Sequence, residues 1–128
     1  MKGRDKAVTE FLAESEDILE DIGSLLTQLE MDHKTSQVHP EVVNSIFRGA
    51  HSLKGLSGML GFNKVSELSH HLENMLDALR LGKVELSGAL LDCLFASLEV
   101  LNAIVGKIGT TGHDEWDIGP AMAQINAV

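Results

Sequence analysis

The sequence is poor in cysteine and in basic residues, and each shortage excludes a class of protein. Its single cysteine, Cys93, excludes a disulfide framework, and its place in an apolar helical pattern predicts a small buried core residue. Lys and Arg total 10 against 19 Asp and Glu, which gives a net charge of −9. Nucleic acids and anionic membrane surfaces require a basic footprint, so we expect neither as a partner.

Long hydrophobic runs are also missing from the sequence. The N-terminal segment, residues 1–6, is charged and leads into amphipathic sequence, and we find no uninterrupted apolar stretch of membrane-spanning length. We therefore expect a soluble, cytoplasmic protein. Because there is no repeat and no strand-like alternation, and 44% of residues are hydrophobic, residues 1–128 are predicted to form a single domain.

Hydrophobic residues recur at helical spacing in four segments separated by short turns. The predicted helices span about residues 7–29, 40–60, 63–81 and 87–108. Together they predict an all-α, antiparallel up-down four-helix bundle over about residues 7–108. We expect a linker at 109–113, then an additional C-terminal helix at about 114–126 with Asp114 as its cap. Asn63 is the predicted cap of the third helix, and residues 31–39 are a predicted surface loop with solvated histidines His33 and His39.

The second predicted helix carries a histidine and two glycines opposite its apolar stripe. With Leu53 at the centre of the stripe, His51 lies roughly 160° away, and Arg48, Gly55 and Gly58 lie within about 60° of His51. Each glycine costs about 1 kcal/mol relative to alanine inside a helix, so something outweighs helix stability here. We interpret Arg48, Gly55 and Gly58 as a docking surface that gives a partner access to an exposed imidazole.

The turn between the second and third helices brings further polar residues toward His51. If this turn centres near Phe62, His51 and Glu73 lie at equal height on adjacent helices, and so do Lys54 and His70. We predict that Glu73 accepts a hydrogen bond from Nδ1 of His51, which fixes the tautomer and leaves Nε2 as a nucleophile. An exposed imidazole with an adjacent cation is what a phosphoryl-accepting histidine needs. We therefore predict that Lys54 neutralises the oxygens of a transferred phosphoryl group and that His70 has an auxiliary role there.

These residues allow two other interpretations. The Glu67-Leu-Ser-His70 segment has the Glu-x-x-His spacing of di-metal sites in helix bundles, but it occurs once, and His70 falls about 160° from its own apolar stripe. We therefore predict no metal site. The alternative function is a non-catalytic helical interaction module in which His51 is a passive surface residue and Glu73 an ordinary surface charge.

Taken together, several motifs resemble the histidine phosphotransfer (HPt) domain, and are most similar to the N-terminal phosphotransfer domain of CheA-type chemotaxis histidine kinases. The resemblance covers about residues 10–105 and is carried by Ile46-Phe-Arg-Gly-Ala-His-Ser-Leu-Lys-Gly55, Gly58, Gly61-Phe62, His70 and Leu72-Glu-Asn-Met-Leu-Asp77.

The resemblance implies phosphorylation of His51 by a kinase ATP-binding domain, in cis or in trans, and transfer to an aspartate of a response-regulator receiver domain. It also implies that the magnesium used in transfer belongs to the receiver, so we expect no cofactor in this chain. Since there is no glycine-rich nucleotide site, we expect no enzymatic activity from the chain in isolation. As an isolated domain it is expected to be a monomer.

Overall fold

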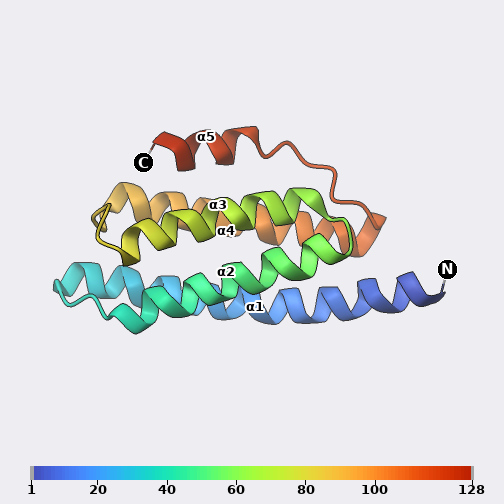
Figure 1. The fold of residues 1–128 in the computed structure, drawn as a ribbon, viewed down its shortest axis with the longest axis horizontal. Coiled ribbons are helices and arrows are strands. Elements are labelled where there is room, and N and C mark those ends of the chain that lie inside the picture. Colours follow the sequence, from blue (N-terminus) through green and yellow to red (C-terminus); the bar gives the residue numbers. More distant parts are fainter. Residues whose placement is uncertain (1, 128) are drawn as a thin grey trace.

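The computed structural model describes residues 2–127, and within that range the chain forms helices and no strands. The helices are α1 (Lys2–Thr35), α2 (Pro40–Met59), α3 (Asn63–Arg80), α4 (Gly88–Thr111) and α5 (Gly119–Ala127). The first four run up and down, each packs against the next, and α4 closes the bundle against α1 (Figure 1). The short α5 packs across α3 and α4. The predicted all-α up-down bundle with an additional C-terminal helix is confirmed.

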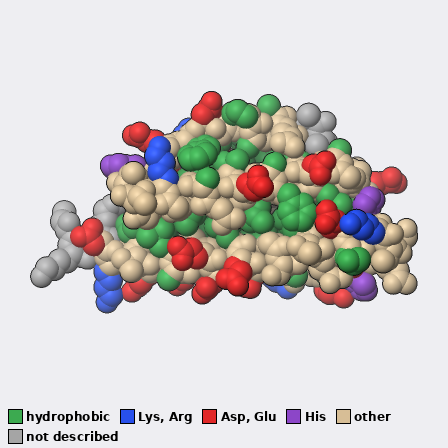
Figure 2. All heavy atoms as spheres, turned by 180° about the vertical axis from the view of Figure 1, so that it is seen from behind, with side chains coloured by type: hydrophobic (Ala, Val, Ile, Leu, Met, Phe, Trp, Pro, Cys, Tyr) green, Lys and Arg blue, Asp and Glu red, His purple; other side chains and the backbone are tan. Residues whose placement is uncertain are grey.

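The core is built from the apolar stripes of all four long helices. Its most deeply buried side chains include Leu19, Leu26, Ile46, Leu53, Leu68, Leu76, Leu94 and Leu101. Seen from behind, hydrophobic side chains form a band along the bundle, and acidic side chains gather along the lower edge, where α1 lies (Figure 2). Cys93 is fully buried, as the sequence predicts, and burial raises the pKa of its thiol.

Helix α4 is more apolar than we expected from the sequence. By length and composition alone it could cross a membrane, although Asp92, Glu99 and Lys107 interrupt its apolar sequence. The reason for this composition is visible in the fold, because α4 contacts α1, α3 and α5 and so buries several sides of its surface. A helix enclosed in this way is apolar around most of its circumference.

Helix α1 extends beyond the predicted 7–29 at both ends. At its C-terminal end the apolar pattern stops, but Asp32 is buried and accepts hydrogen bonds from Gln28 Nε2 (2.7 Å) and from the backbone N–H of His39 (3.3 Å). These bonds tie the last turn to the start of α2. The helix ends only before Ser36, whose φ is 57°.

The predicted loop histidines have different positions in the structure. His33 lies in the last turn of α1, and His39 is the N-cap residue of α2. Nδ1 of His39 lies 3.0 Å from Oδ2 of Asp32. This hydrogen bond raises the pKa of His39 and lowers the pKa of Asp32, since each group favours the charged form of the other.

The caps of α3 and α5 also differ from the prediction. Phe62, not Asn63, is the N-cap residue of α3, and its side chain makes no capping hydrogen bond. Instead, Asp114 Oδ2 accepts a hydrogen bond from the backbone N–H of Lys64 at 2.7 Å. Asp114 therefore pairs a first-turn N–H group of α3, although it lies 50 positions further along the chain. It does not cap α5, which begins five residues after it, at Gly119.

The predicted linker at 109–113 is displaced toward the C-terminus. Helix α4 continues through Gly109 to Thr111 and ends at Gly112, which has a φ of 77°. A single glycine inside a helix costs only about 1 kcal/mol relative to alanine. The packing of α4 against α1 outweighs this cost, so the helix continues through Gly109. The connection between α4 and α5 consequently spans residues 112–118.

Candidate phosphotransfer site

The site begins with the orientation of α2. Ile46, Ala50 and Leu53 are buried on one face, as the helical period predicts. His51 lies on the opposite side, and 63% of its side chain is exposed. An imidazole with this exposure is accessible to a second protein.

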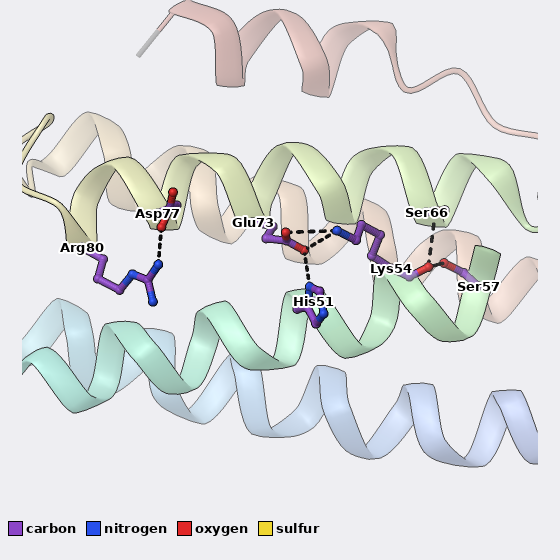
Figure 3. Close-up of polar contacts among 7 residues, drawn as sticks. All are labelled: His51, Lys54, Ser57, Ser66, Glu73, Asp77 and Arg80. Carbon is purple, nitrogen blue, oxygen red and sulfur yellow. Dashed lines mark hydrogen bonds and ion pairs between the residues drawn. The ribbon is translucent and has the colours of Figure 1, made fainter. Parts of the chain in front are cut away.

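The α2–α3 hairpin brings Glu73 to His51. Helix α2 ends at a turn in which Gly61 has a φ of 78°, a conformation that favours glycine, and Phe62 is buried behind it. The turn returns α3 antiparallel to α2, so that Nδ1 of His51 lies 3.0 Å from Oε2 of Glu73 (Figure 3). The predicted contact between these two residues is confirmed.

Glu73 is the centre of the polar cluster. Its carboxylate is 14% exposed and also receives Lys54, whose Nζ lies 3.0 Å from Oε1 and 2.9 Å from Oε2. Burial alone would raise the pKa of Glu73, but the hydrogen bonds from Lys54 and His51 outweigh it, so the pKa lies below its ordinary value. The carboxylate is therefore ionised and can act only as an acceptor.

An ionised acceptor at Nδ1 selects one tautomer of His51. The proton must reside on Nδ1 to donate to Glu73, and the lone pair of a neutral ring is then on Nε2. Figure 3 shows one ring nitrogen turned toward Glu73 and the other turned away from it. The geometry thus presents a nucleophilic nitrogen on an exposed side chain.

Lys54 makes a contact that we did not predict. Its ammonium is paired with both carboxylate oxygens of Glu73. Its side chain is 28% exposed, and its backbone carbonyl accepts hydrogen bonds from Ser57 Oγ (3.1 Å) and Ser66 Oγ (3.4 Å). Lys54 thus links α2 to α3 next to His51.

His70 does not join this cluster in any described contact. It is exposed on α3, and its ring lies 6.0 Å from that of His71. Glu67 is exposed as well, which confirms that the Glu-x-x-His pair points outward. Among the residues that the structure describes, no group of three or more His, Cys, Asp or Glu is arranged to hold a metal ion.

The three predicted docking residues are all exposed, but they are not equivalent. A Cβ atom at Gly55 would meet nothing within 4 Å, whereas one at Gly58 would lie 3.5 Å from Ser66 Oγ of α3. Arg48 donates from Nη2 to Ser45 Oγ at 3.0 Å. Gly55 therefore leaves open space on the His51 side of α2, and Gly58 lies where α2 and α3 approach each other.

Sequence reasoning missed Phe47, which lies beside His51, and Arg80, which contacts Phe47. The ring of Phe47 is stacked near the His51 imidazole, and the guanidinium of Arg80 lies over Phe47. Phe47 and His51 are four residues apart, which places them on one helix face, and this spacing was the available signal. The contribution of Arg80, from the far end of α3, had no local signal in the sequence.

Comparison with known proteins decides the family. Residues 6–105 match the family described as the Hpt domain. The chain belongs to the Hpt domain family. It is 37% identical over 116 residues to the "Chemotaxis protein CheA" of Bacillus subtilis (strain 168), which covers 91% of this chain and 17% of the relative. The chain thus spans about a sixth of that relative's length.

Solved structures agree with this assignment. The "Solution Structure of Histidine Phosphotransfer Domain of CheA" matches with a TM-score of 0.83 and 30% identity, over 96% of this chain and 91% of that one. The phosphorylated P1 domain of CheA3, in complex with CheY6 from R. sphaeroides, matches with a TM-score of 0.80 over 95% of this chain and 91% of that one. At 19% identity, the latter establishes the shared fold. The resemblance seen in the sequence is confirmed.

Proposed function

We propose that this Hpt domain carries a phosphoryl group on Nε2 of His51, taken from a histidine kinase ATP-binding domain and passed to a response-regulator receiver aspartate. The observation that carries the proposal is the exposed imidazole whose Nδ1 lies 3.0 Å from the Glu73 carboxylate. A histidine that served only as a surface residue would not need an ionised, largely buried partner at one nitrogen.

The chemistry of acceptance follows from the tautomer. The Nε2 lone pair attacks the γ-phosphorus of ATP, an N–P bond forms, and the bond between phosphorus and the bridging oxygen breaks, releasing ADP. The ring keeps its proton on Nδ1 and becomes cationic, and the adjacent Glu73 carboxylate stabilises that charge. In the return step, a receiver carboxylate oxygen attacks phosphorus, and the electron pair of the N–P bond returns to Nε2.

Lys54 contributes to both states of the site. In the unphosphorylated protein it compensates the charge of Glu73 and holds that carboxylate toward His51. Lys54 lies about one helical turn after His51. After phosphorylation its ammonium can therefore donate hydrogen bonds to the new phosphoryl oxygens. His70 is proposed only as an auxiliary polar group on the same helix as Glu73.

The partners follow from the chemistry and the surface. Arg48, Gly55 and Gly58 form the proposed docking surface, and the solved P1 domain in complex with CheY6 supports a receiver as one partner. Magnesium for transfer is proposed to come from the receiver, so this chain needs no cofactor of its own. We propose a cytoplasmic, monomeric domain that lacks kinase activity by itself and acts in chemotaxis or another two-component pathway.

The proposal is tested with labelled ATP and a CheA-type kinase domain. We expect wild-type protein to acquire a label that is lost in acid and kept in base, as a phosphoramidate is, and to lose it to an added receiver. His51→Gln is expected to remain unlabelled with the stability changed by less than about 0.5 kcal/mol, since exposed side chains contribute little. Equal labelling of both proteins would reject His51 and favour the passive interaction module.

A further inference from the structure

A second group of contacts reaches His51 from within its own helix. The Phe47 and His51 rings have centroids 6.5 Å apart and planes inclined by 13°. The two rings are therefore stacked, with a centroid separation inside the range of about 4.5–7 Å that aromatic pairs favour. Phe47 is half-buried and packs against the core, so it offers the exposed imidazole a firm apolar surface.

The neighbouring helix holds Phe47 in turn. The guanidinium carbon of Arg80 lies 4.5 Å from the Phe47 ring centroid, a distance typical of cation–π contacts. Arg80 is itself paired with Asp77 one turn earlier on α3 (Figure 3). Helix α3 therefore acts on His51 twice, directly through Glu73 and indirectly through Arg80 and Phe47.

We propose that Phe47 and Arg80 are positioning residues of the phosphotransfer site, a statement that rests on the proposed function. The hydrogen bond to Glu73 fixes one atom of the His51 ring but leaves the ring free to tilt about that bond. Contact with Phe47 restricts the tilt, so that Nδ1 stays on Glu73 and Nε2 keeps one direction. Arg80 keeps Phe47 in the orientation that makes this contact.

The first test uses the tautomer of His51, which a merely structural role would not change. Nitrogen-15 NMR of the folded protein measures the fraction of the ring with its proton on Nδ1. We expect Phe47→Leu to lower the ratio of the Nδ1–H tautomer to the Nε2–H tautomer by about 2- to 10-fold. This is the change in an equilibrium ratio that corresponds to losing the free energy of one aromatic pair. Phe47→Tyr, which keeps the ring, is expected to retain the wild-type ratio.

The second test uses phosphoramidate, a small phosphoryl donor that needs no docking surface. The Nε2 lone pair attacks its phosphorus, an N–P bond forms on His51, and the donor's own N–P bond breaks with release of ammonia. The labelling rate of Phe47→Leu is expected to fall with the tautomer ratio. The matched control is Phe95→Leu, which removes a half-buried ring from α4.

Arg80 is tested in the same two measurements. Arg80→Ala should shift the tautomer ratio in the same direction as Phe47→Leu and by a smaller factor, and Arg80→Lys should recover part of it because the cation is restored. Lys83→Ala removes an exposed cation shortly after α3 and controls for net charge. Since Arg80 is exposed, these variants are expected to fold even if Phe47→Leu does not.

Wild-type tautomer ratios in Phe47→Leu and Arg80→Ala would overturn the inference. So would equal effects in the Phe95 and Lys83 controls. The tautomer ratio is measured without any phosphoryl transfer, so it decides the positioning role even if the kinase fails to label His51. Failure of the proposed function is recognised separately, by the absence of a label on wild-type protein.

Discussion

Nδ1 of His51 and Oε2 of Glu73 lie 3.0 Å apart although 22 residues separate them in the chain. The contact exists because the α2–α3 turn places the two residues at the same height on adjacent helices. It converts an exposed surface histidine into a ring with a defined tautomer, and the proposed chemistry depends on that tautomer.

Lys54→Ala is expected to fold and to accept a phosphoryl group more slowly. A hydrogen bond to a charged group is worth about 1.5–3 kcal/mol, so the rate of labelling by the kinase domain should fall roughly 10-fold or more. Single-turnover labelling measures this. Lys34→Ala, at an exposed position near the end of α1, is the matched control and should keep the wild-type rate.

Replacement by alanine is predicted to change the stability of the protein in opposite directions at two glycines of α2, Gly55 and Gly49. Gly55→Ala has open space and should stabilise the protein by about 0.5–1 kcal/mol. At Gly49 a Cβ would lie 3.0 Å from Ile22 Cγ1 of α1, so Gly49→Ala should destabilise it by about 1–3 kcal/mol through overpacking. Urea unfolding of both variants measures the difference, and an equal response would contradict the described helix packing.

Gly55→Leu tests the docking surface separately from stability. The added side chain should leave the fold intact but hold a receiver domain away from Nε2, and such small displacements are costly in group transfer. Transfer from phosphorylated protein to the receiver should slow, whereas labelling by phosphoramidate should not. An unchanged rate of phosphoryl transfer to the receiver would show that Gly55 does not provide space for receiver docking.

Stability is predicted to depend on pH through Asp32 and His39. The pKa of His39 is raised above 6.5, so its contribution is complete below that value and is lost as the pH rises through the raised pKa. The pKa of Asp32 is lowered below 3.8, so its contribution is complete above 3.8 and is lost as the pH falls through the lowered pKa. Stabilisation by the pair is therefore complete between the two ordinary values.

Comparison with His39→Ala isolates this effect. The Tm of wild-type protein should exceed that of the variant at about pH 5.5, and the difference should shrink toward about pH 8 as His39 loses its proton. His113→Ala, which removes an exposed histidine after α4, should show no such trend. A wild-type advantage that is independent of pH would contradict the charged pair.

Asp114→Ala is predicted to destabilise α3, although Asp114 lies outside that helix. Loss of the hydrogen bond to the Lys64 N–H leaves a first-turn donor unpaired, which typically costs about 1 kcal/mol. Hydrogen exchange at the first turn of α3 should accelerate together with a fall in Tm. Asp92→Ala, at an exposed position on α4, is the control and should change neither.

Helical periodicity was sufficient to predict the bundle and the contact between His51 and Glu73, because both depend on residues counted along two helices from one turn. The ion pair of Lys54 with Glu73 was not predicted, since a long flexible side chain can reach several partners. Asp114 was assigned to the wrong helix because its true partner, Lys64, is 50 positions away in the chain. The contact of Arg80 with Phe47 likewise depends on side-chain conformations that the spacing of residues does not determine.

The most direct test of the central hypothesis is to locate phosphorus in the phosphorylated protein, which has 6 histidines. After labelling by the kinase domain, nitrogen-15 and phosphorus-31 NMR identify the bonded residue and the bonded ring nitrogen. We predict phosphorus on Nε2 of His51, with the proton retained on Nδ1 beside Glu73. Phosphorus on Nδ1 of His51, or on any other histidine, would contradict the proposed site.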